Sequence, residues 1–254
     1  MATYKKRGYK PKDKREQEAQ DMQSTTAEVF NTLDETASKS EQWIEKNSKP
    51  LFYGLTLVAV VILGFLGYNK YIAEPAEIKA SDDLAFPRKY YEAASLAGKD
   101  VDSLLNLALE GANGKYGFVD IATVHSGTKA GNLANYYAGL TYLQLKDYKN
   151  AIKYLDEFSS DDEALGPIAT GNIGDAFSDL DQEDKALEYY EKAANKAANE
   201  FTTPMYLFKA GTVAMNLKKF DKALSLFTQI KEKYPTSTQG KDIDKYISMV
   251  KYVQ

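Results

Sequence analysis

The sequence predicts an all-α protein in which a solenoid of stacked helix pairs is attached to a single N-terminal transmembrane helix. Three observations predict this fold class. Residues 51–68 carry no charged side chain, and after them a pattern of small and apolar residues recurs three times. The segment 240–253 then has the apolar spacing of a terminal capping helix, with Ile243, Tyr246, Ile247 and Val250 facing inward.

The uncharged stretch is predicted to cross a membrane as a helix over residues 50–71. Its eighteen residues rise ~27 Å, and extension to Tyr71 matches a hydrocarbon layer of about 30 Å. Tyr53, Tyr68 and Tyr71 lie near its ends, where amphipathic rings prefer to sit. A buried core helix would keep a polar stripe, and a secretory signal would lie closer to the N-terminus.

Residues 1–49 are predicted to form a basic tail and a membrane-adjacent helix in the cytoplasm. The tail, residues 4–15, holds seven basic side chains against Asp13 alone. Positive charge favours the cytoplasmic side, which places the following domain, residues 72–254, across the membrane. The tail is either a solubilising arm or an arm that touches anionic lipid or ribosomal RNA.

Composition excludes several function classes for the large domain. After residue 70 there are 21 Lys and Arg against 27 Asp and Glu, so nucleic acid is not an expected partner. The absence of Cys and the single histidine, His125, exclude a disulfide, a multi-histidine metal site and a His-paired triad. The acidic run 161–163 is typical of a solvated loop. We therefore expect no enzyme activity, cofactor or metal.

The repeat is defined by a glycine, an alanine twelve residues later and an apolar residue four beyond that. The glycines are 35 and 37 residues apart. A glycine on the first helix of a pair lets the second helix approach closely. Pro167 and Pro204 fall at the joints, near the starts of first helices. The three sets are Gly139, Ala151 and Leu155; Gly174, Ala186 and Tyr190; and Gly211, Ala223 and Phe227.

This pattern resembles the tetratricopeptide repeat, which implies a concave groove lined by the first helices. Extended or partly folded protein segments are the ligands that such a groove fits. Tyr136, Leu140 and Phe208 could instead simply pack between repeats. The resemblance places these residues in the groove: Tyr136, Leu140 and Leu143 in the first unit, Asn172, Asp175 and Asp179 in the second, and Phe208, Thr212, Met215 and Asn216 in the third.

The whole layout resembles the YfgM-type ancillary subunits of the SecYEG translocon. The resemblance rests on the segment 43–47 before the span, the run Ala-Gly-Asn-Leu-Ala at 130–134 and the repeats. It implies residence in a bacterial inner membrane, a periplasmic repeat domain, contact with SecYEG and cooperation with a PpiD-like periplasmic chaperone. Two alternatives stay open: an envelope scaffold for another membrane or cell-wall complex, and a cytoplasm-facing adaptor if the topology is reversed.

Overall fold

A computed structural model describes residue 29, residues 32–33 and residues 41–253. The basic tail predicted at 4–15 lies outside the described residues. The chain divides into two compact units at Tyr68 and Asn69.

In the first unit, helix α2 (Ser48–Tyr68) covers most of the predicted span and buries none of its residues. The sequence placed the span at 50–71, so the helix begins two residues earlier and ends three earlier. The helical stretch Ser48–Leu96 is the only one in the described part that is long and apolar enough to cross a membrane, with a window of mean hydropathy 2.2. Just before it, Trp43 and Ile44 are exposed on a helical turn.

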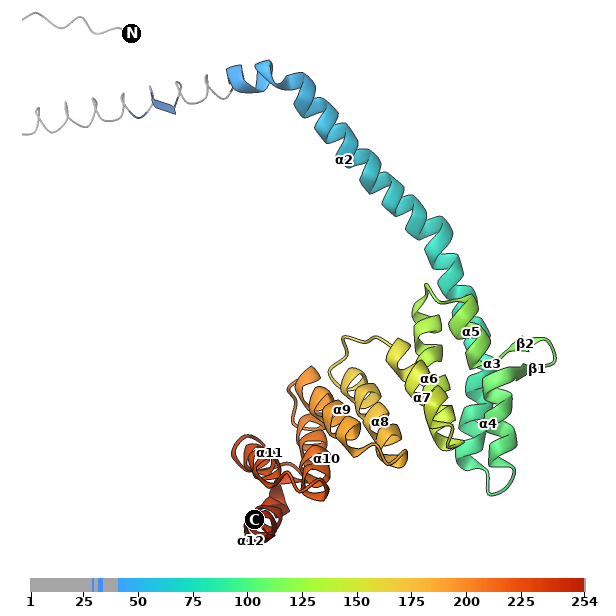
Figure 1. Cartoon of the computed structure of the whole chain (residues 1–254). Helices are drawn as coiled ribbons and strands as arrows, with labels where there is room; N and C mark the ends of the chain where they lie inside the picture. The colour runs from blue at the N-terminus through green and yellow to red at the C-terminus, as the bar shows by residue number, and fades with distance from the viewer. Residues whose placement is uncertain (1–28, 30–31, 34–40, 254) are drawn as a thin grey trace, which may run out of the picture. The chain divides into compact units, whose positions relative to one another are not determined.

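The second unit is a helical array whose elements follow one another in chain order (Figure 1). A π-helical turn, η1 (Asn69–Ala73), leads into α3 (Glu74–Leu96), α4 (Val101–Glu110), β1 (Gly111–Ala112), β2 (Lys115–Tyr116) and α5 (Phe118–Val124). Three helix pairs follow: α6 (Lys129–Gln144) with α7 (Tyr148–Glu157), α8 (Leu165–Asp179) with α9 (Glu183–Lys196), and α10 (Thr202–Asn216) with α11 (Phe220–Lys233). A 3₁₀ turn, η2 (Gly240–Asp242), and α12 (Ile243–Val253) close the array.

The predicted all-α solenoid is confirmed by the way these pairs stack. Helix α9 packs against both α8 and α10, and α11 packs against both α10 and α12. The expected capping helix buries Ile243, Ile247 and Val250, while Tyr246 is half-buried.

The glycines of the repeat lie where the second helix of each pair approaches most closely. A Cβ added at Gly139, Gly174 or Gly211 would come within 3.0 Å of a side chain on that helix. The side chain met is always the apolar residue sixteen positions later: Leu155, Tyr190 or Phe227. The spacing read from the sequence therefore records a direct contact between the two helices of each pair.

Every first helix ends in the same three-residue turn. In the first pair, the N–H of Lys146 donates to the carbonyl of Leu143 at 3.0 Å, and the N–H of Asp147 donates to Tyr142 at 2.9 Å. This is the Schellman arrangement, which requires a left-handed residue after the helix. Lys146 has φ 60°, and Asp181 and Lys218 take its place in the other pairs with φ 55° and 57°.

A two-stranded hairpin between α4 and α5 was not predicted. Strands β1 and β2 pair antiparallel, with Gly111 opposite Tyr116 and Ala112 opposite Lys115. The connecting residues Asn113 and Gly114 both have positive φ, 53° and 73°. Asn-Gly is the commonest sequence for such a turn, so the signal was present in the chain.

Helix α3 is part of the array and not a free linker. The Glu77 carboxylate accepts from the N–H groups of Lys129 and Ala130 at 2.7 and 3.0 Å, so it caps α6. His125, which the sequence placed in a loop, is buried, and its Nε2 lies 2.9 Å from Asp83 of α3. These contacts fix the first turns of α3 to the start of the first repeat.

Candidate functional site

The first helix of the first pair presents the three predicted groove residues on one face. Tyr136, Leu140 and Leu143 of α6 are half-buried and pack against the cluster that contains Leu155 and Ile173. The ring of Tyr136 also lies 5.0 Å from that of Phe158. Burial raises the pKa of Tyr136, as do the neighbouring rings of Tyr91 and Tyr137. These side chains both pack between helices and keep part of their surface exposed.

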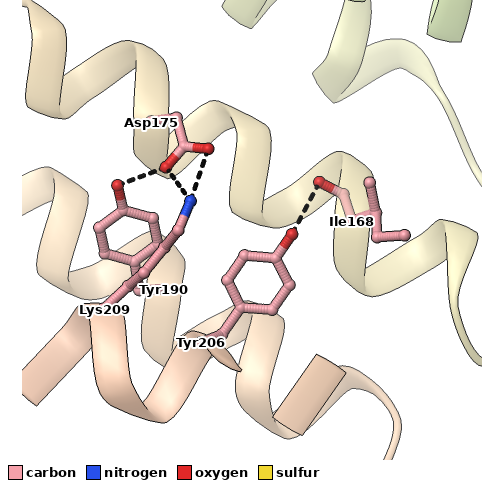
Figure 2. A network of polar contacts seen from close by, with 5 residues as sticks. All are labelled: Ile168, Asp175, Tyr190, Tyr206 and Lys209. Carbon is pink, nitrogen blue, oxygen red and sulfur yellow. Dashed lines mark hydrogen bonds and ion pairs between the residues drawn. The ribbon is translucent and has the colours of Figure 1, made fainter. Parts of the chain in front are cut away.

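In the second pair, the carboxylate of Asp175 binds two other side chains of the array. Its Oδ1 accepts from the hydroxyl of Tyr190 at 2.6 Å, and its two oxygens accept from Nζ of Lys209 at 2.7 and 2.8 Å (Figure 2). Asp175 therefore bridges α8 to α9 and to α10. The other two predicted residues of α8 differ from it: Asn172 is half-buried and Asp179 is exposed.

Two tyrosines complete this network. The Tyr206 hydroxyl points to the carbonyl of Ile168 at 3.5 Å, and its ring stacks on that of Tyr190 with centroids 6.3 Å apart (Figure 2). Burial raises the pKa of Tyr190, and its hydrogen bond to Asp175 adds to the effect. Burial and then the charge of Asp175 raise the pKa of Tyr206. The network joins the second and third repeats.

In the third pair, the predicted residues of α10 divide into packed and exposed ones. Phe208 and Met215 are half-buried against the C-terminal core, and the ring of Phe208 lies 4.7 Å from that of Tyr246 on α12. Thr212 and Asn216 are exposed. The Asn216 amide donates to Glu183 at 3.3 Å, which links α10 to α9.

The structure thus brings the predicted residues onto three first helices that are stacked in order, with none of the ten fully buried. Asp179, Thr212 and Asn216 are the most accessible, and the apolar members are exposed only in part. The surface offers apolar area with few free charges.

The structure has a second candidate surface that was not predicted from the sequence. An open hollow of about 710 Å³ lies between α7 and α9, with Leu155, Phe158, Ile173 and Tyr189 among its lining residues. Glu188 and Lys192, paired at 2.7 Å, also line it.

On one side of this hollow, α7 has 10 residues, whereas α9 and α11 have 14. The chain leaves α7 early because the Asn132 side chain holds the backbone of Ser159, donating to its carbonyl at 2.7 Å and accepting from its N–H at 3.0 Å. The run Ser159-Ser-Asp-Asp162 could have indicated an early helix end.

One residue of the acidic run 161–163, Asp162, caps a helix. Asp162 accepts from the N–H groups of Ala164 and Leu165 at 2.9 and 2.8 Å, at the start of α8. The bonds from Leu165 and Ala164 hold the pKa of Asp162 below its usual range. Among residues 41–253, no group of three potential ligands is arranged to hold a metal ion.

Comparison with protein families identifies tetratricopeptide repeats at three places in the chain. The matches cover residues 134–158, 170–195 and 206–237. They fall on the pairs α6–α7, α8–α9 and α10–α11, so the repeat units expected from the sequence are confirmed. Such repeats are typically non-catalytic modules for protein interaction. A comparison with curated proteins finds no match to the chain.

Proposed function

We propose that this chain is a membrane-anchored, non-enzymatic protein-binding subunit whose repeats hold extended or partly folded polypeptides. The observation that carries the proposal is the row of partly exposed apolar side chains on first helices that match the tetratricopeptide repeat. Leu140 and Met215 each contact the core on one side and keep accessible surface on the other. Removal of apolar surface from water then drives association with an apolar segment.

The proposed ligands are internal segments of polypeptides and not charged C-termini. The ten groove positions include no Lys or Arg that could clamp a carboxylate, and the nearby Lys209 is paired with Asp175. Backbone and apolar side chains are what this surface can recognise.

For the membrane arrangement we propose a cytoplasmic N-terminal part at 1–49, a span at 50–71 and a repeat domain at 72–254 in the periplasm. The length and apolar composition of α2 support the anchor. The seven basic residues of the tail support the orientation. The resemblance to YfgM-type subunits supports a place beside SecYEG and a PpiD-like chaperone in a bacterial inner membrane.

Photo-crosslinking in cells tests the binding surface. A photoreactive residue at Leu140 or Thr212 should capture polypeptides in transit, whereas one at Ser225, exposed on the second helix α11, should capture far less. Equal capture at the three positions would contradict the assignment of the groove.

Affinity isolation and thiol labelling test the location. SecYEG should be recovered from detergent extracts, and recovery of wall-synthesis proteins without SecYEG would favour an envelope scaffold. A cysteine at the exposed Lys185 should react with an impermeant reagent once the outer membrane is permeabilised. Labelling only after lysis would reverse the topology.

A further inference from the structure

The turn η1 and the first turns of α3 expose apolar side chains on the side opposite to the residues that α3 buries. Tyr71, Ile72 and Ile78 are 81%, 57% and 56% exposed, and Pro75 between them is exposed as well. We call these four residues the entry face. The inward side of the same helix buries Ala80, Leu84 and Pro87, so the entry face has no contact with the core to explain its composition.

The apolar character of this side of α3 ends abruptly. Beyond Ile78 the exposed positions that continue the same face are Asp82, Ala85, Lys89 and Glu92, and only Leu96 at the far end is large and apolar. Whatever covers the entry face therefore reaches only about the first two turns of the helix.

Covalent geometry limits how far the entry face can lie from a bilayer. Only residues 69–73 separate the end of α2 from the start of α3. Even a fully extended chain would span no more than about 22 Å from Tyr68 to Glu74. These five residues form a π-helical turn, so the distance is shorter. The headgroup layer beyond the hydrocarbon is about 5–8 Å deep.

We infer that the entry face is embedded in the lipid headgroup layer, so that the repeat unit itself rests on the membrane surface. The inference depends on α2 being the anchor proposed above. Lys79 follows the four residues, and its ammonium group suits lipid phosphates. Glu74 is paired with Lys70 at 2.8 Å, and Glu77 is engaged in capping α6, so neither carboxylate is left unpaired beside the headgroups.

Depth measurement by spin labelling tests this contact in the full chain. The protein has no native Cys, so single cysteines at Tyr71 and Ile78 can carry a nitroxide after reconstitution into nanodiscs of neutral and anionic phospholipids. Lys89, on the same side of α3 but beyond the entry face, is the matched aqueous control, and Val58 within α2 is the lipid control. The ratio of collision with oxygen to collision with a nickel chelate should be several-fold higher at Tyr71 and Ile78 than at Lys89.

Each other outcome overturns the inference in a distinguishable way. A lipid reading at Val58 with an aqueous reading at Ile78 would reject the lipid contact and leave the anchor intact, whatever the label at Tyr71 reports, because Tyr71 is the last residue of the proposed span. An aqueous reading at Val58 would reject the anchor together with the contact. Labels at Tyr71 and Ile78 that meet neither reagent would show that protein, such as a second copy of the chain, covers the face.

Discussion

At the scale of single residues, the three glycines of the repeat are positions where no side chain fits. At Gly174, an added Cβ would lie 2.7 Å from ring carbons of Tyr190. That ring is held by its hydrogen bond to Asp175 and by stacking on Tyr206, so it cannot simply move aside.

Gly174→Ala should therefore lower the free energy of unfolding by about 1–3 kcal/mol, the usual cost of overpacking a core. Gly98→Ala is the matched control, because a Cβ there meets no atom within 4 Å. Urea unfolding of the full chain in detergent, followed by near-ultraviolet circular dichroism, measures both. Equal stability of the two variants would show that the Tyr190 ring relaxes freely.

Residue-scale contacts also mark the limit of what the sequence could predict. The glycine spacing predicted the contacts of Gly139, Gly174 and Gly211 because neighbouring helices repeat one short pattern. It could not predict that Asp175 is paired with Lys209, because that contact depends on how two repeats are stacked. Asp175 was consequently assigned to ligand binding, whereas the structure uses it between repeats.

At the scale of elements, the turn between the helices of each pair places a non-glycine residue in the left-handed conformation. Lys146, Asp181 and Lys218 have φ between 55° and 60°. Such a conformation costs a residue with a Cβ about 1–2 kcal/mol. Glycine removes that cost. It also makes the unfolded chain more flexible, which lowers the free energy of unfolding by about 0.4–1 kcal/mol.

Glycine at any of the three positions should thus raise the free energy of unfolding by about 0.5–1 kcal/mol. Lys153→Gly, at an exposed position inside α7, should lower it by about 1 kcal/mol. Chemical denaturation of the four variants makes the comparison. A loss of stability in Lys146→Gly and Lys218→Gly would mean that their lysine side chains contribute more than the backbone conformation costs.

Helices could be predicted from the sequence where apolar and small residues recur at regular spacing. The repeats and the capping helix show such spacing, and the structure confirms that they exist. The short hairpin at Gly111–Tyr116 has only its Asn113-Gly114 turn, and strands of two residues show no alternation. At the hollow between α7 and α9, the run after α7 could have indicated an early helix end, but the contact of Asn132 with Ser159, 27 residues later, could not be predicted from local patterns.

At the scale of the whole molecule, buried tyrosines make stability depend on alkaline pH. Tyr190 and Tyr206 are 4% and 2% exposed, and burial raises the pKa of each. In the unfolded chain tyrosine loses its proton near pH 10. The folded chain keeps its proton at that pH, so this contribution is fully present below about pH 10 and is lost as pH rises further.

The free energy of unfolding should fall above pH 10, by up to about 1.4 kcal/mol per pH unit for each of these tyrosines. Thermal unfolding of the full chain between pH 8 and pH 12 measures the slope. The double variant Tyr190→Phe with Tyr206→Phe should have a shallower slope, even though it loses the hydrogen bond to Asp175. An unchanged slope would assign the alkaline loss to other groups, such as the half-buried Tyr91, Tyr136 and Tyr142, whose pKa values burial also raises.

The constant turn within each helix pair has a consequence for how the molecule can vary. Residues 145–147, 180–182 and 217–219 are equal in length, whereas the connections between pairs, 158–164 and 197–201, differ. Insertions and deletions are therefore tolerated along one edge of the array and not along the other. A reporter domain inserted after Ser160 would leave the helix stacking intact, while one inserted at Lys146 would separate the two helices that Gly139 and Leu155 hold together.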